Sequence, residues 1–194
     1  MNKNIEKMRV SLKTYHQKAL ETEKKIAQMR KELLPEVADG RIKAAQAELE
    51  NLKLNTIDQI SAAADEGRKE VSEWYKINSA DIDQADSALL RSGIRLTQQE
   101  IDELCIKHKN NGTMTRVIAD YIDQRNHEAG RDMSRMVFSP YLETPDRKNQ
   151  VWDKLEHTAD GIIARISSGR GFASGADDPF VISSVETFGQ NLES

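Results

Sequence analysis

The sequence predicts an all-α protein. A long antiparallel, coiled-coil-like helical hairpin (residues 1–78) is followed by a small helical domain (79–166) and an extended C-terminal tail (167–194) that is flexible or ordered by a partner. Three observations predict this: an apolar repeat of helical period near the N-terminus, helix caps and breakers at short intervals after it, and no strand pattern before the tail. The composition agrees, because 31% of the residues are charged and only 5% are aromatic. Long helices with a narrow apolar seam have this balance, since most of their surface faces water.

Residues 5–33 carry the clearest periodic signal. Their apolar side chains recur at alternating spacings of three and four, interrupted only by Thr22. A 3.5-residue period sustained in this way favours a left-handed supercoil over a lone surface helix. The members of this seam are Ile5, Met8, Leu12, Tyr15, Ala19, Ile26, Met29 and Leu33.

A break at residues 34–40 separates this helix from a second one. Pro35 disfavours helical geometry at Leu34 and cannot donate a backbone hydrogen bond, and Asp39-Gly40 is a turn dipeptide. The second helix is expected over residues 41–76, with a less regular apolar seam. A short connection between two long helices predicts an antiparallel hairpin.

The seam of the first helix has two interpretations. It packs only against residues 41–76 of the same chain, or it joins further copies or a different protein in a larger bundle. The mismatch between a strict heptad and an irregular partner slightly favours additional partners. On that interpretation the interaction residues are Ile5, Met8, Leu12, Tyr15, Ile26, Met29 and Leu33.

Caps and breakers divide residues 79–166 into several short helices. The expected helix starts are Asn78 or Ser79, Thr97 in a capping box with Glu100, Thr113, and Thr144 followed by Pro145 at the first helical position. The expected ends are Ser92-Gly93, Asn110-Asn111-Gly112 and Gly130. These short elements predict a small helical domain that is separate from the hairpin.

The single cysteine, Cys105, lies three residues before His108, a pair that could supply two metal ligands. A structural zinc site needs four ligands, and the other histidines are scattered, so we expect no metal and no cofactor. Cys105 is expected to be a small core residue, where a thiol stays protonated. The sequence offers no nucleotide-binding loop and no catalytic constellation, which predicts a non-enzymatic protein. No stretch approaches the ~20 apolar residues of a membrane span, so no membrane partner is expected.

DNA binding is the alternative function. Residues 97–125 read as helix, Asn-Asn-Gly turn and helix, the outline of a helix-turn-helix. The second helix would present Thr113, Thr115 and Arg116. Residues 93–131 carry six basic and six acidic residues, and the whole chain has a net charge of −4. A reader of the major groove normally adds a basic face, so nucleic acid is not the favoured partner.

The tail is rich in Gly and Ser and contains three of the four phenylalanines, Phe172, Phe180 and Phe188. One interpretation is a disordered end, and the other is a peptide that docks on a neighbouring protein with these three side chains as anchors. Residues 180–182 could pair as a short strand on a partner's sheet edge.

The segment LLRSGIRLTQQEIDELCIKHKNNGTMTRVIADYI, residues 89–122, resembles a module of small helical proteins that tailed bacteriophages and prophages encode near their capsid genes. The matching positions are Leu90, Ser92, Gly93, Leu96, Thr97, Glu100, Leu104, Asn111, Thr113, Met114 and Arg116. The coiled N-terminus is also similar to that of phage scaffolding or minor head proteins.

This resemblance implies a structural or assembly role without catalytic residues. The expected protein is a phage-type assembly protein that self-associates, or binds capsid or other virion proteins, through its helical seams and its tail. Its expected location is the host cytoplasm during assembly, or the virion. The alternative remains a DNA-associated or regulatory adaptor that uses residues 97–125.

Overall fold

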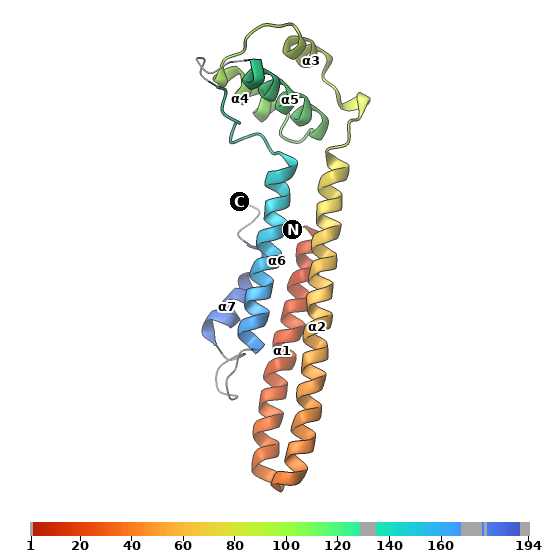
Figure 1. Cartoon of the computed structure of the whole chain (residues 1–194), viewed down its shortest axis with the longest axis vertical. Coiled ribbons are helices and arrows are strands. Elements are labelled where there is room, and N and C mark those ends of the chain that lie inside the picture. The colour runs from red at the N-terminus through yellow and green to blue at the C-terminus, as the bar shows by residue number, and fades with distance from the viewer. Residues whose placement is uncertain (1, 129–134, 168–175, 177, 191–194) are drawn as a thin grey trace. The chain divides into compact units, whose positions relative to one another are not determined.

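The computed structural model describes residues 2–128, 135–167, 176 and 178–190. Within these ranges the chain is helical and contains no strand, which confirms the predicted all-α class (Figure 1). The chain divides into two compact units, residues 1–67 with 151–194 and residues 68–150. Helices α2 and α6 each contribute residues to both units.

The N-terminal hairpin consists of α1 (Lys3–Glu32) and α2 (Pro35–Trp74), as predicted. Leu33 has extended backbone angles, and Pro35 is the first residue of α2, a position where its missing N–H costs nothing. The predicted break at residues 34–40 was too long, because Asp39 and Gly40 lie inside α2. A glycine inside an exposed helix costs only about 1 kcal/mol, which the neighbouring helical turns offset.

The first unit has its core where α1 and α2 meet α6 (Pro145–Ser167) and α7 (Pro179–Thr187). The hydroxyls of Tyr15 and Ser167 lie 3.0 Å apart, and Ser61 of α2 donates to Glu156 of α6 at 2.8 Å. The α6 side chains buried in this core are Trp152, Leu155, Ala159, Ile162, Ile163 and Ile166. The seam of α1 is therefore covered by helices of its own chain.

Helix α7 replaces the strand that was considered for residues 180–182. Asp178 caps it by accepting a hydrogen bond from the backbone N–H of Phe180 at 2.8 Å, and Pro179 occupies its first position. Val181, Val185 and Phe188 then lie on one helical face and are buried. The Asp-Pro pair is a helix-start signal that outweighs the strand propensity of a short apolar run.

The second unit contains a 3₁₀ turn (Ser79–Asp81) and the helices α3 (Gln84–Arg91), α4 (Gln98–Lys107) and α5 (Gly112–Glu128). Its core is formed by apolar side chains from all three helices and the segments beside them. The buried members are Leu90, Leu96, Ile101, Leu104, Cys105, Ile118, Tyr121, Ile122 and Leu142.

Two of the predicted helix starts hold, and two move along the chain. Thr97 and Glu100 form the predicted capping box, and Thr144 accepts a bond from the N–H of Arg147 at 3.3 Å. However, α3 is capped by Asp83 rather than by Asn78 or Ser79, because Asn78 caps the 3₁₀ turn. Likewise Asn111, not Thr113, accepts from the N–H of Met114 at the start of α5. Neighbouring Asn, Asp, Ser and Thr residues are similar as caps, so tertiary contacts select among them.

No described helix contains an apolar stretch of the length needed to cross a bilayer.

Candidate functional site

Most of the α1 seam residues are core residues of their own chain. Five of the seven predicted interaction residues are at most 5% exposed: Ile5, Met8, Leu12, Tyr15 and Ile26. Met29 and Leu33 are half-buried beside Ile26. Of the two interpretations, packing within the chain is therefore the one that the structure shows, and these five side chains are not available as a docking face.

The turn end of the hairpin is thinner than the rest of the first unit. The last residue of α6 is Ser167, which lies level with Tyr15. Beyond that level α1 and α2 continue side by side past α6 and α7 (Figure 1). Their buried apolar cluster there consists of Ile26, Ala38 and Ile42. A contact this small between two helices leaves most of their surface open to solvent.

A second apolar seam runs along the open side of α2 in this region. It follows the coiled-coil spacing of three and four, and all six of its residues are exposed. Val37 is 48% exposed and Leu54 is 53% exposed, which is high for large apolar side chains. We name this seam the outer stripe of α2; it consists of Val37, Gly40, Ala44, Ala47, Asn51 and Leu54.

Sequence reasoning missed the outer stripe although its signal was present. The sequence pattern places Gly40 in a turn, so Val37 and Gly40 were not recognised as residues of a helix. The remaining members are small or polar, and two alanines with an asparagine do not form an obvious apolar row. The stripe becomes recognisable only when the other face of α2 is seen to be occupied. Ala38 and Ile42 are buried on that face, and Ala45, Leu49 and Leu52 are half-buried.

Exposed charges flank the outer stripe. Arg41 and Lys43 lie on the side nearer the turn, and Glu48 and Glu50 lie on the far side. Glu50 also accepts from Lys53 at 3.0 Å, an exposed pair that solvent screens strongly. The stripe therefore has an apolar centre with a basic half and an acidic half.

The three phenylalanines of the tail do not act as one set of anchors. Phe188 is 3% exposed and packs in the core of the first unit, whereas Phe180 is 58% exposed with the guanidinium of Arg165 over its ring at 4.6 Å. Phe172 lies outside the described residues. His16 donates from Nε2 to the carbonyl oxygen of Ala176 at 2.7 Å. Ala176 and helix α7 thus pack on their own α1, and Phe180 is the one described anchor that stays accessible.

Two of the three side chains that the helix-turn-helix interpretation assigns to DNA recognition are buried. Thr113 and Thr115 are 2% and 3% exposed. The Thr113 hydroxyl accepts from the backbone N–H of Asn78 at 3.0 Å and donates to the carbonyl of Lys76 at 3.4 Å. Only Arg116 points to solvent. Helix α5 therefore does not present the expected side chains to a DNA groove.

Cys105 and His108 have separate partners. Burial raises the pKa of the Cys105 thiol, which keeps it protonated, and Ser139 is its hydrogen-bond partner. His108 instead lies with Nε2 2.6 Å from Oδ2 of Asp86. The structure does not combine the two residues in one site.

Asp83, Asp86 and His108 offer ligand atoms within 4.8 Å of one another, in the geometry of a small metal site. The ammonium of Lys107 already fills the cation position, 2.6 Å from Oδ2 of Asp86 and 3.1 Å from Oδ2 of Asp83. A hydrogen bond from the N–H of Asp86 and then the one from Lys107 lower the pKa of Asp83. Burial alone would raise the pKa of Asp86, but the bonds from Lys107 and His108 hold it below its ordinary value. The cluster is an ion-pair network that joins the start of α3 to the end of α4.

Asp86→Asn is expected to destabilise the protein by about 1–2 kcal/mol at neutral pH, because it removes the charged acceptor shared by Lys107 and His108. A carboxyl whose folded pKa is lowered contributes stability above its unfolded pKa of about 3.9 and loses it as the pH falls further. Urea unfolding should therefore separate variant from wild type at pH 7, and the difference should shrink as the pH falls below about 4. The exposed Asp123→Asn is the matched control, and an equal loss in that variant would contradict the assignment.

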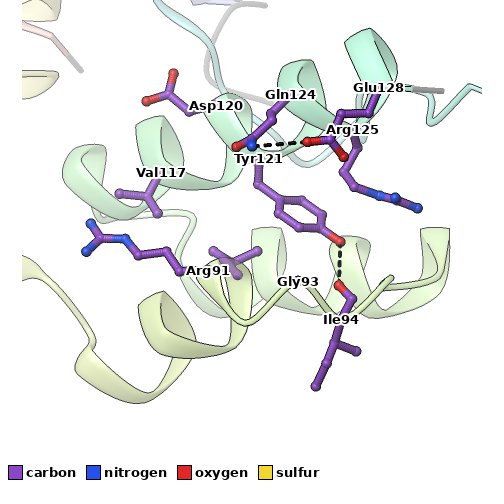
Figure 2. A pocket seen from close by; sticks show the side chains of 10 residues that line it. Arg91, Gly93, Ile94, Val117, Asp120, Tyr121, Gln124, Arg125 and Glu128 are labelled. Carbon is purple, nitrogen blue, oxygen red and sulfur yellow. Dashed lines mark hydrogen bonds between the residues drawn. The ribbon is translucent and has the colours of Figure 1, made fainter. Parts of the chain in front are cut away.

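A pocket of about 420 Å³ lies in the second unit between the end of α3, the following loop and α5 (Figure 2). Tyr121 crosses it and is fully engaged: its hydroxyl accepts from the N–H of Leu96 and donates to the carbonyl of Ile94, both at 3.1 Å. Arg125 and Glu128 line the same pocket, and Glu128 accepts from Gln124 at 3.2 Å. These two hydrogen bonds hold the loop against α5, so Tyr121 has a structural role.

Comparison with known proteins gave no assignment. No family model matches the chain, and no significant match was found among curated proteins or among solved structures. The outer stripe of α2 is the described surface with coiled-coil spacing, and its two large apolar side chains, Val37 and Leu54, are exposed.

Proposed function

We propose that the protein is a non-catalytic assembly protein that joins larger complexes through the outer stripe of α2. The observation that carries this proposal is a helix with two apolar seams, one of which is packed while the other is exposed over six heptad positions. A helix of a solitary globular domain normally has one apolar face and one polar face. A second apolar face at coiled-coil spacing is typical of a helix that receives another helix.

The thin turn end of the hairpin supports the same proposal. At the turn end the two helices share only Ile26, Ala38 and Ile42 as buried residues. Burial of apolar surface therefore stabilises their contact only a little there. A third or fourth helix against the outer stripe would cover Val37 and Leu54 and extend this small core. The proposed site is therefore the place where added contacts would stabilise the hairpin most.

The setting that we propose is virion assembly of the phage type, with copies of the chain, capsid or other virion proteins as partners. The resemblance of residues 89–122 supports this setting. Several of its residues are caps or core residues of the second unit, such as Thr97, Leu104 and Met114. These positions stabilise the second unit, while the outer stripe supplies the contact surface of the proposal.

The proposal is tested by measuring particle mass by sedimentation equilibrium at high protein concentration, at low and high salt, with and without duplex DNA. We expect multimers that persist in high salt without DNA, because their contact is apolar at its centre. Ala44→Glu combined with Ala47→Glu should reduce these multimers, whereas Ala164→Glu on the exposed face of α6 should not. A monomer that instead forms a salt-sensitive complex with DNA would favour the adaptor function and overturn the proposal.

A further inference from the structure

We propose that the partner of the outer stripe is the same stripe of a second copy, with the two α2 helices antiparallel and related by a twofold axis between Ala45 and Gln46. This inference rests on the proposed assembly function and names its partner. It is carried by an agreement between the apolar spacing of the stripe and the order of the charges beside it.

The six positions of the stripe are symmetric about that axis. Turning one copy end over end places Val37 opposite Leu54 of the second copy, Gly40 opposite Asn51, and Ala44 opposite Ala47. The large side chains meet at the two ends, and the small residues meet at the centre, where the helices approach most closely. A Cβ atom on Gly40 would meet nothing within 4 Å in its own chain, so the space there is open to the Asn51 amide of the second copy.

The charges beside the stripe invert about the same axis. Arg41 and Lys43 lie toward the turn, and Glu48 and Glu50 lie away from it. An antiparallel partner brings its acidic pair to the basic pair of the first copy. Arg41 then meets Glu48 of the second copy, and Lys43 meets its Glu50. In an antiparallel coiled coil, each of the two heptad positions beside the apolar seam pairs with the same position of the partner helix. The twofold axis repeats both pairs, and each of these four residues gains an opposite charge.

The same charges would also pair in a parallel dimer, in which Lys43 meets Glu48 and Arg41 meets Glu36 of the second copy. The fit of the stripe residues selects the antiparallel arrangement instead. A parallel partner places Gly40 opposite Gly40, whereas an antiparallel partner places the Asn51 amide over the open space at Gly40 and Val37 against Leu54. Cross-linking separates the two arrangements.

The contact spans 18 residues from Val37 to Leu54, or about 26 Å of helix. Its centre is built from small side chains, so the buried area is at the low end for specific interfaces and the dimer should be transient. Measurements therefore need high protein concentrations, because small interfaces bind weakly.

Disulfide cross-linking tests the register. The background is Cys105→Ala, which removes the one native thiol, and its folding is to be checked by circular dichroism before the cross-linking. Val37→Cys and Leu54→Cys are made as separate chains and oxidised alone and as an equimolar mixture. We expect a cross-linked dimer in the mixture and little in either chain alone, because only residues 37 and 54 of different copies lie opposite each other. Cross-linking of each chain with itself would show a parallel contact and overturn the proposal.

Charge reversal provides an independent test. Arg41→Glu with Lys43→Glu makes the flanks all acidic, and Glu48→Lys with Glu50→Lys makes them all basic. Each double variant should dimerise at least about tenfold more weakly than the wild type in sedimentation equilibrium, because like charges then face each other. An equimolar mixture of the two should recover the wild-type strength. Equal dimerisation of all four samples would overturn the proposed interface.

The outcomes separate this inference from the proposed function. Salt-resistant multimers that neither cross-link in the mixture nor respond to charge reversal would overturn the antiparallel dimer while leaving assembly through another surface in place. A wild-type protein that stays monomeric at the highest concentration would overturn the dimer and count against self-association as well. Cross-linking in the mixture of cysteine variants, together with recovered dimerisation in the mixture of charge-reversal variants, would support the inference.

Discussion

Gly112→Ala is expected to destabilise the protein by about 3 kcal/mol or more, since the substitution overpacks a site with no room. Gly112 is the first residue of α5, and a Cβ atom there would overlap the backbone carbonyl of Trp74 and approach its indole ring. Backbone atoms cannot rotate away as the end of a flexible side chain can. The start of α5 would have to move from the end of α2, and the cap at Asn111 would move with it.

Gly161→Ala is the matched control for this prediction. Gly161 lies in the middle of α6, and a Cβ atom there would meet nothing within 4 Å. Removing glycine from an open helical position should stabilise the protein by about 0.5–1 kcal/mol. Urea unfolding followed by circular dichroism should therefore shift in opposite directions for the two variants. The same small shift in both would show that Trp74 does not press on Gly112.

Leu12→Asp is expected to cost about 4 kcal/mol or more of unfolding free energy, since it places an ionisable group without a partner in a fully buried position. Leu12 is 0% exposed and lies among the seam residues of α1 that α6 and α7 cover. The carboxyl can remain there only by binding a proton, so the loss should be smaller at pH 4 than at pH 8. Thermal and urea unfolding at the two pH values measure both effects.

Ile26→Asp and Thr14→Asp are comparison variants for this prediction, because their side chains differ from Leu12 in burial or surroundings. Ile26 is equally buried but belongs to the small cluster at the turn end, where water lies closer, so the expected loss is about 2 kcal/mol. Thr14 is exposed, and its replacement should change stability by less than about 0.5 kcal/mol. A loss for Leu12→Asp no larger than that for Thr14→Asp would contradict the core position of the α1 seam.

The sequence predicted those parts of the fold in which several local signals agree. The heptads of α1, the Pro35 turn and the Thr97–Glu100 capping box each combine periodicity with a cap or a breaker, and each is present in the structure. The errors fall where alternatives differ by about 1 kcal/mol or less, as between Asn111 and Thr113 as the cap of α5. Tertiary packing decides such cases, and a local pattern does not contain it.

The candidate site was the hardest feature to predict. Ile5 and Leu12 were reasonable interaction residues as long as the helices that bury them were unplaced. The outer stripe of α2 could be identified only by elimination, once one face of the helix was known to be filled. Sequence periodicity identifies apolar seams, but it does not say which seam the chain covers with its own helices.

Helix α1 contacts α7 and the residue Ala176 that lies three positions before it, so the hydrogen bond of His16 to Ala176 joins residues 160 positions apart in the chain. During synthesis, α1 is therefore made long before α7, which covers part of its seam. At roughly 5–20 residues per second, translation of the intervening chain takes on the order of ten to thirty seconds. Throughout that interval Ile5 and its neighbours in the α1 seam remain without their C-terminal cover. The order of synthesis therefore leaves part of the α1 seam exposed until the C-terminal helix has been made.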